Sequence, residues 1–497
     1  MRVNLKSLVG GWMVLLASAV SLAAASDLRL IEAVKNNDTA AVRALLKQHP
    51  DVNAPQGDGA TALHWAVHRD DLNTADLLMR AGAHVDVAND LGVTPLYLAC
   101  TNRNAAMVQK LLTARANPNA ALLNGETVLM NCARAGDVGA VKALLAHGAN
   151  VNAKESSHDQ TALMWAAAQR HPQVVEALVE HGADLGARSR IYNQTVASEN
   201  TQRAGREELN YITPRGGSTP LLFAARSGDV ESAGLLLSAG ADVNDTLPDG
   251  TSALVLAAYS GHGAVAALLL EKGADPNAAA VGYTALHAAV LRGDLDLVKG
   301  LVAHGANPNA PITKGTPLRR ESQDLQLPKT LIGATPYLLA AKYLEVNMMP
   351  VLVAAGADPR LAMKDGTTPL MAAAGMGVSL SGNLARADRR NLQVVDGGKM
   401  EEESRVVATV TAALNLGGDV KAVNQAGETA LHSAALLGYD RVVQRLVDNG
   451  AQLNVKNARG QTPLAAVTGP SAAGAAKSRE IAYQSTADLL RKLGAVE

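Results

Sequence analysis

Aromatic residues are scarce in this chain of 497 residues: they make up 3% of the composition against 48% for all hydrophobic residues, and Phe223 is the single phenylalanine. A compact domain of this length normally fills its centre with large rings. A core of Ala, Leu and Val instead suggests thin layers of closely approaching helices. One large globular core is therefore not expected.

Charge of one sign is also lacking, since 45 Lys and Arg residues stand against 46 Asp and Glu residues. No global field therefore attracts nucleic acid or an anionic membrane. The few rings offer little base stacking, which also disfavours nucleic-acid binding. Cysteine is limited to Cys100 and Cys132. Two cysteines exclude a disulfide-rich scaffold and a zinc site built from four cysteines.

The first 25 residues have the three parts of a secretory signal peptide. Arg2 and Lys6 precede an apolar stretch over residues 8–22, and small residues at 23–25 come before Ser26. We expect cleavage after Ala25, which would leave a mature chain without a membrane span that is periplasmic or secreted. The alternative is an uncleaved membrane anchor. It is disfavoured because the apolar run is near the short end for crossing a bilayer.

One phrase recurs along the rest of the chain at nearly constant spacing. It reads GATALHWAV at 59–67, GVTPLYLAC at 92–100, GSTPLLFAA at 217–225 and GETALHSAA at 427–435, and it occurs eleven times in all. Its first hydroxyl residues Thr61, Thr94, Thr127 and Thr161 are 33, 33 and 34 residues apart. A period in this range is typical of a solenoid of stacked helical units.

Each unit predicts two short helices. The Thr caps the first helix, and a following Pro, such as Pro95, stands where no backbone N–H is needed. A Leu faces the core, and an Ala-Ala pair lets the next helix approach closely. The second helix carries a Leu pair, such as Leu144-Leu145, and stops at a glycine, such as Gly148.

This pattern resembles the ankyrin repeat family, whose repeat runs from G-x-T-P-L-H-x-A-A to L-L-x-x-G-A-D-x-N. The resemblance covers residues 27–497 apart from three insertions. It implies an all-α repeat solenoid of about twelve units including caps, in which each helix–turn–helix is followed by a β-hairpin finger. With the export signal and the Ala-rich repeats, the chain resembles bacterial periplasmic ankyrin proteins, some of which support a partner enzyme.

The insertions divide the repeats into blocks. The predicted order is a signal peptide at 1–25, repeats at 26–187 (an N-terminal cap and four full repeats), 217–310, 333–374 and 405–497 (with the C-terminal cap), and insertions at 188–216, 311–332 and 375–404. The first two insertions fall where fingers are expected and should lengthen them. The third falls between the two helices of one repeat. Long loops of this kind are either functional or solvated spacers.

Chemistry-bearing motifs are sparse. The sequence has no H-E-x-x-H, C-x-x-C, phosphate-binding loop or G-x-S-x-G motif. His64, His287 and His432 share the fourth position of T-A-L-H. A histidine in phase with the fold is interpreted as bridging neighbouring turns rather than binding metal. We therefore predict no catalytic residue, metal or cofactor.

The two cysteines allow two interpretations. Cys100 and Cys132 occupy the paired-Ala positions of adjacent repeats, offset by one residue. The favoured interpretation is two small buried side chains. A disulfide needs Cα atoms about 4.4–6.8 Å apart, and neighbouring repeats usually stack farther apart than this.

The ends of the first helices carry a stripe of basic and Tyr residues, expected on the concave face. The candidate partner-binding residues of this stripe are Arg69, Arg134, Arg226, Tyr259, Arg292, Lys342 and Tyr343, and those of the insertions are Tyr192, Arg206, Tyr211, Arg319 and Arg320. The alternative is an ordinary solvated face. Trp65, Trp165 and Phe223, each four residues after the capping Thr, are interpreted as packing between repeats.

The predicted function is a non-catalytic scaffold that binds another protein through the concave face and the extended fingers. Arg side chains can form forked hydrogen bonds to carboxylates, so the expected partner has an acidic surface, such as an extracytoplasmic enzyme. The alternative is a ligand-binding or catalytic role housed in the insertions at 188–216 or 311–332. An enzyme would need convergent groups at fixed geometry, which flexible insertions rarely supply.

Overall fold

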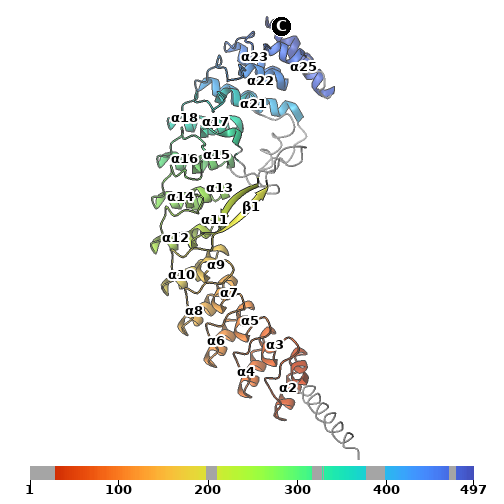
Figure 1. Ribbon diagram of the computed structural model, residues 1–497, viewed down its shortest axis with the longest axis vertical. Coiled ribbons are helices and arrows are strands. Elements are labelled where there is room, and N and C mark those ends of the chain that lie inside the picture. Colours follow the sequence, from red (N-terminus) through yellow and green to blue (C-terminus); the bar gives the residue numbers. More distant parts are fainter. Residues whose placement is uncertain (1–27, 198–209, 316–326, 328, 377–397, 470–476) are drawn as a thin grey trace, which may run out of the picture. The chain divides into compact units, whose positions relative to one another are not determined.

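The structure of the protein is a computed structural model that describes residues 28–197, 210–315, 327, 329–376, 398–469 and 477–497 (Figure 1). The predicted signal peptide and the candidate residues Arg206, Arg319 and Arg320 lie outside these ranges. The described chain divides into two compact units. The first comprises residues up to 191 together with 216–242, and the second comprises residues 192–215 and 243–497.

The first unit consists of helix pairs. After a helix at 28–35, its helices are α2 Thr39–Leu46, α3 Ala62–His68, α4 Leu72–Arg80, α5 Pro95–Thr101, α6 Ala105–Thr113, α7 Val128–Ala135, α8 Val138–Ala146, α9 Ala162–Ala168, α10 Pro172–Glu180, α11 Pro220–Ser227 and α12 Val230–Ser238. Within this unit the first helices of the pairs lie in one row and the second helices in another (Figure 1).

The second unit repeats the same plan around one hairpin. Its elements are β1 Tyr192–Ala197, β2 Asn210–Arg215, α13 Ala253–Ser260, α14 Gly263–Glu271, α15 Ala285–Arg292, α16 Leu295–Ala303, the 3₁₀ turn η2 Lys329–Leu331, α17 Pro336–Lys342, α18 Met348–Ala354, α19 Pro369–Ala373, α21 Gly398–Asn415, α22 Ala430–Leu437, α23 Asp440–Asp448, α24 Pro463–Thr468 and α25 Lys477–Lys492. The predicted class, an all-α repeat solenoid of ankyrin type, is confirmed.

The capping residues account for the start and end of each short helix. The Thr94 hydroxyl accepts a hydrogen bond from the Tyr97 backbone N–H at 3.2 Å, and Pro95 occupies the first turn of α5. A cap of this kind contributes about 1 kcal/mol. At the other end of a first helix, Gly136 terminates α7 with φ +78°, a conformation that glycine adopts without a side-chain clash.

The core is the thin apolar layer that the composition predicts. Leu63, Leu96 and Leu129 on successive first helices are almost completely buried, as are Leu78 and Leu144 on second helices. Each buried Leu contributes roughly 2 kcal/mol through the hydrophobic effect. Because Ala lines the contacts between first helices, neighbouring repeats pack closely without rings. No helix in the described ranges combines the length and the apolar character needed to cross a membrane.

The repeated histidines connect neighbouring repeats, as predicted. The Thr61 backbone N–H donates to Nδ1 of His64 at 3.1 Å, so Nε2 carries the proton and donates to the Val93 carbonyl at 3.0 Å. Nε2 of His287 and of His432 makes the same contact to the carbonyls of Ala334 and Gln461. Burial lowers the pKa of all three imidazoles, that of His287 to about 4.

Asparagine side chains make a second set of ties that the sequence reading missed. Nδ2 of Asn119 donates to the Gly148 carbonyl at 3.1 Å, and its Oδ1 accepts from the Asn150 N–H at 2.7 Å. Asn277 makes the same two contacts, to Gly305 and Asn307, in the second unit. The signal was present in the recurrent Asp-Val-Asn and Asn-Pro-Asn runs, whose last residue faces the following repeat.

The expectation of two separate cysteines is wrong. Cys100 in α5 and Cys132 in α7 form a disulfide, with their Cα atoms 4.7 Å apart and both side chains fully buried. The close approach follows from the small residues around them, since Ala99 and Ala133 let the two first helices meet. The same Ala-rich contacts that replace rings in the core thus bring adjacent repeats within disulfide range.

Two insertions contribute regular structure. Strands β1 and β2 form an antiparallel hairpin in which Tyr192 pairs with Arg215 and Ala197 with Asn210. Before the hairpin, Arg190 holds the neighbouring finger through a two-pronged contact with Asp159, at 3.1 and 2.8 Å. Helix α21 begins at Gly398, inside the segment 375–404 predicted as an insertion, and so makes a second helix of 18 residues.

Candidate functional site

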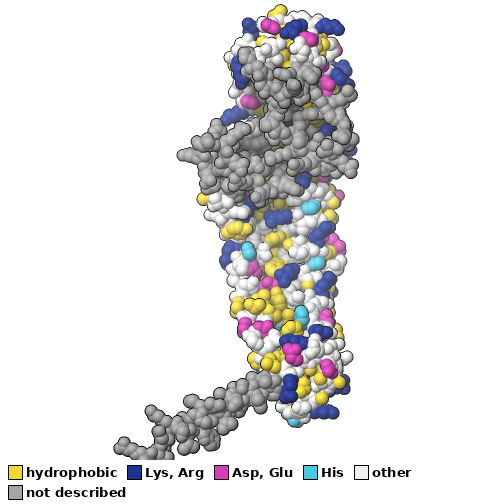
Figure 2. Space-filling model, turned by 90° about the vertical axis from the view of Figure 1, so that its right-hand side faces the viewer, with side chains coloured by type: hydrophobic (Ala, Val, Ile, Leu, Met, Phe, Trp, Pro, Cys, Tyr) yellow, Lys and Arg dark blue, Asp and Glu magenta, His cyan; other side chains and the backbone are white. Residues whose placement is uncertain are grey.

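The predicted stripe lies at the C-terminal ends of the first helices, a surface we call the first-helix face of each unit. In the first unit, Arg69, Arg134 and Arg226 are exposed there. In the second unit, Tyr259, Arg292, Lys342 and Tyr343 are all half-buried. On the side drawn in Figure 2, the N-terminal part of the chain shows basic side chains interleaved with apolar ones.

Arg134 is held by its neighbours. One guanidinium nitrogen lies 3.2 Å from a carboxylate oxygen of Glu126 and donates to Oδ1 of Asn131 at 3.0 Å. The guanidinium carbon lies 4.8 Å from the ring centre of Trp165 in the next repeat. A cation over an indole face is stabilising by about 0.5–1 kcal/mol when partly exposed. Arg134 thus connects two repeats as well as presenting charge.

A buried polar network supports Arg134 from below. The Tyr97 hydroxyl donates to Glu126 at 2.8 Å, and Nδ2 of Asn131 donates to the Tyr97 carbonyl and to the Thr101 hydroxyl at 3.0 and 2.8 Å. Burial, reinforced by the hydrogen bond to Glu126, raises the pKa of Tyr97 to about 12. The network spans α5 and α7, the same two helices that the disulfide joins.

Rings of the first unit lie at this face. Trp65, Trp165 and Phe223, predicted to pack between repeats, are half-buried rather than fully enclosed. The Lys35 ammonium lies 4.8 Å from the ring centre of Trp65, and the indole N–H of Trp65 donates to Gln56 in the adjacent finger at 3.1 Å. The rings therefore contact neighbouring repeats through cations and still present part of their surface.

Basic side chains of the second unit are more enclosed. Nε of Arg292 donates to the Tyr259 carbonyl at 2.8 Å, and its guanidinium lies 5.9 Å from the Tyr259 ring centre. The Tyr259 ring in turn lies 6.0 Å from that of buried Tyr283. This cluster ties two consecutive repeats together, so Arg292 is engaged within the protein.

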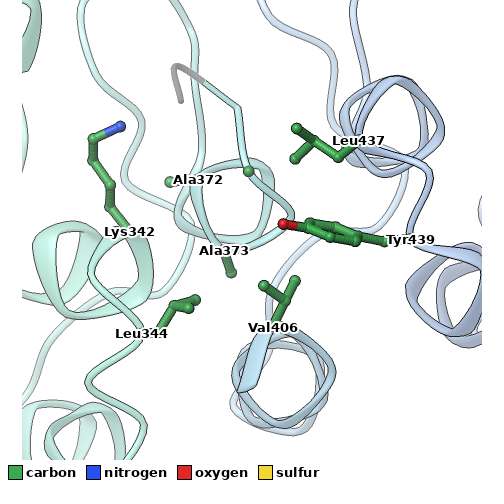
Figure 3. A pocket seen from close by; sticks show the side chains of 8 residues that line it. Lys342, Leu344, Ala372, Ala373, Val406, Leu437 and Tyr439 are labelled. Atoms are coloured by element: carbon green, nitrogen blue, oxygen red, sulfur yellow. The ribbon is translucent and has the colours of Figure 1, made fainter. Parts of the chain in front are cut away.

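Lys342 lies beside a small apolar pocket (Figure 3). The pocket is lined by Lys342, Leu344, Ala372, Ala373, Gly375, Val406, Leu437 and Tyr439. Figure 3 shows the Lys342 ammonium directed away from Tyr439 and Val406. Burial lowers the pKa of Lys342, and the negative charge of Asp365 opposes that shift. The stripe residues predicted to lack charge after this point include Gly375 and Leu437, which here form apolar walls.

The fingers add exposed apolar side chains that the sequence reading did not single out. Leu91 and Leu123 of the first unit are 68% and 82% exposed. Their fingers touch, since a Cβ built on Gly92 would lie 3.2 Å from the backbone of residues 122 and 123. In the second unit Tyr192 and Ile212 of the hairpin are 49% and 70% exposed. Tyr211 pairs with Val196.

Comparisons with known proteins agree with the fold. Models described as ankyrin repeats match residues 30–121, 106–189, 221–312, 163–237 and 414–465, more than half of the chain. The chain belongs to the ankyrin repeat family. Membership implies a scaffold for protein–protein interaction. Among the described residues, no group of His, Cys, Asp and Glu is arranged to hold a metal ion.

Individual relatives share only part of their length with this chain. The B-cell lymphoma 3 protein of Homo sapiens is 32% identical over 121 residues, which are 24% of this chain and 26% of that protein. The probable E3 ubiquitin-protein ligase XBOS33 of Oryza sativa subsp. japonica is 36% identical over 125 residues, 24% of each. Palmitoyltransferase ZDHHC13 of Homo sapiens is 39% identical over 70 residues, 14% of this chain and 11% of the relative. The chain thus spans about a quarter or less of these relatives.

Proposed function

We propose that this ankyrin repeat protein is a non-catalytic scaffold that works outside the cytoplasm and binds a partner protein through the first-helix faces and the fingers. The observation that carries the proposal is the first-helix face of the first unit. Half-exposed rings, exposed arginines and the exposed finger residues Leu91 and Leu123 occur together there. Aromatic and Arg side chains surrounded by apolar contacts are the usual centres of binding energy in protein interfaces.

The proposed compartment rests on two independent features. Residues 1–25 have the composition of a secretory signal peptide. The disulfide between Cys100 and Cys132 is of a kind that persists in oxidising compartments and is rare in a reducing cytoplasm. A periplasmic or secreted location accounts for both, and bacterial periplasmic ankyrin proteins remain the resemblance that fits best.

An acidic surface is the partner chemistry that we propose. Arg69 and Arg226 are exposed on the first unit, and guanidinium groups form paired hydrogen bonds with carboxylates. An extracytoplasmic enzyme with acidic side chains around its docking surface would meet this requirement. The rings between the arginines would supply the apolar part of the contact.

A capture experiment with two variants tests the proposal. The intact mature protein, a variant with residues 192–215 replaced by a short Gly-Ser turn, and the double variant Arg69→Glu/Arg226→Glu would be exposed to an extracytoplasmic extract. We expect the charge variant to lose partners at low salt and the hairpin variant to retain fewer. Arg80→Glu is the matched control, since Arg80 is exposed on a second helix. Equal capture by all four proteins would contradict the proposal.

A further inference from the structure

Two arginines of the first unit occupy backbone positions where arginine is unfavourable. Arg103 and Arg170 have φ +58° and +61°. They follow the first helices α5 and α9, at the turn into the second helix. A side chain in this left-handed region crowds its own backbone, whereas glycine does not. Gly136 and Gly228 stand at the equivalent turns after α7 and α11. The turn itself therefore needs no side chain.

The other non-glycine residues at this turn have structural duties. The carboxylate of Asp70, with φ +56°, accepts hydrogen bonds from Asn102 and Asn104 of the next repeat at 3.0 and 3.2 Å. Leu344 of the second unit, with φ +59°, lines the apolar pocket. In contrast, the side chains of Arg103 and Arg170 are exposed and make no hydrogen bond or ion pair with the described part of the chain.

The charge beside these two arginines is also unusual. In the first unit, Asp71, Asp137 and Asp229 cap the second helices α4, α8 and α12. The cap after Arg103 is instead the neutral residue Asn104, and the cap after Arg170 is His171, whose Nε2 contacts the Arg134 carbonyl. The acidic cap is thus missing at the two turns that carry an arginine, which leaves their positive charge without a neighbouring carboxylate cap.

These arginines complete a regular row. Every full repeat of the first unit presents one exposed arginine at the end of its first helix or at the turn that follows: Arg69, Arg103, Arg134, Arg170 and Arg226. Glu126, the buried carboxylate near the row, is already engaged by Arg134 and Tyr97. Half-exposed Trp65, Trp165 and Phe223 lie on the same helices, α3, α9 and α11.

We infer that Arg103 and Arg170 are retained against their backbone preference because they bind carboxylates of a partner, an acidic protein segment with apolar side chains between its charges. The inference rests on the proposed function and restricts it to the first unit. Charge complementarity selects the occupant, and the adjacent rings accommodate its apolar side chains. Left-handed backbone held at surface positions without an internal purpose is typical of functional sites.

The two arginines should therefore separate stability from binding. The double variant Arg103→Gly/Arg170→Gly removes the crowding and the charges together. We expect its unfolding temperature to equal or exceed that of the wild type. We expect its affinity for a fluorescent poly-glutamate peptide to fall about tenfold, which corresponds to about 1.4 kcal/mol. Wild-type binding should weaken with added salt.

Arg115 provides a matched control. It is exposed, has φ +67° and lies after the second helix α6, away from the first-helix face. Arg115→Gly relieves the same conformation and removes the same charge, and we expect it to leave peptide binding unchanged. Equal affinity of the double variant and the wild type would overturn the inference. So would equal loss in Arg115→Gly, which would indicate net charge alone.

Two further measurements keep the inference separate from neighbouring explanations. A single-stranded oligonucleotide of equal charge that binds as tightly, with the same dependence on Arg103 and Arg170, would overturn the assignment to an acidic protein segment. Capture from an extracytoplasmic extract distinguishes the two levels of proposal. If the wild type retains no partner, the proposed function fails. If the partner is retained equally by Arg103→Gly/Arg170→Gly, only this inference fails.

Discussion

The two units share one repeat pattern and use the same position in opposite ways. Four residues after the capping hydroxyl, the first unit has Trp65, Trp165 and Phe223, all half-exposed. The second unit has Leu256, Ala288, Leu339, Ala372, Ser433 and Ala466 there, all buried. Small side chains let neighbouring repeats cover them, whereas rings extend beyond the cover. A position that is structural in one unit is thus available for recognition in the other.

Basic residues show the same contrast. The arginines of the first unit are exposed, and Arg69, Arg103 and Arg170 are without hydrogen bonds or ion pairs to the described residues. Arg292 of the second unit donates to a backbone carbonyl, and Lys342 is half-buried beside a pocket. The comparison teaches that a row of basic residues in a repeat sequence includes both recognition surface and inter-repeat ties.

The largest expected difference between the units is redox dependence. Cys100→Ala/Cys132→Ala, or added reductant, should lower the free energy of unfolding of the first unit by about 3–4 kcal/mol, because the disulfide closes a long loop. The second unit has no cysteine and should be unaffected. Tryptophan fluorescence during denaturant unfolding of the mature chain reports the first unit alone, through Trp65 and Trp165. A midpoint insensitive to reductant would contradict this expectation.

Acid should destabilise the second unit more than the first. His287 and His432 are buried neutral in the second unit, and His64 in the first. A lowered pKa in the folded state gives stability that is present above the unfolded pKa of about 6.5 and is lost as pH falls toward the folded pKa. For His287 the loss should extend from about pH 6.5 to about 4 and amount to a few kcal/mol.

Circular dichroism of thermal unfolding at a series of pH values measures this loss. His287→Leu is the informative variant, because it removes the titrating group. It should lower stability at neutral pH and reduce the slope of stability against pH below 6.5. A slope unchanged by this substitution would show that other groups control the acid response.

Replacing an exposed ring by the residue type of the second unit should affect binding more than folding. Trp165→Leu copies Leu256 and removes the ring beneath Arg134. We expect stability to fall by about 1 kcal/mol and affinity for the captured partner to fall about tenfold. Leu256→Met in the second unit is the control and should leave affinity unchanged. Titration calorimetry and denaturant unfolding separate the two quantities.

The smallest expected effect concerns single arginines and folding stability. Arg292→Ala should lower the free energy of unfolding by about 1–2 kcal/mol, because it removes a hydrogen bond to the Tyr259 carbonyl and a cation–ring contact. Arg69→Ala should change it by less than about 0.5 kcal/mol, since Arg69 is exposed. If both variants were equally stable, the distinction between tie and recognition residue would fail.

Local chemistry made most of the fold predictable. Thr94 followed by Pro95 marks a helix start, and a glycine such as Gly148 marks a helix end, because caps act over a few residues. The role of His64 was predictable for the same reason, since its period matches that of the fold. Candidate site residues were placed on the correct face, but exposure separated Arg69 from Arg292 only once neighbouring repeats were in position.

By itself, the sequence determined the repeat class, the helix boundaries and the thin Leu/Ala core, all of which depend on contacts within one period. Only the tertiary structure decided that Cys100 and Cys132 join, that Trp165 remains half-exposed beneath Arg134, and that Arg103 and Arg170 adopt left-handed backbone without an internal partner. These features depend on distances between neighbouring repeats. Such distances are fixed by packing across the stack, which the order of residues within one repeat does not contain.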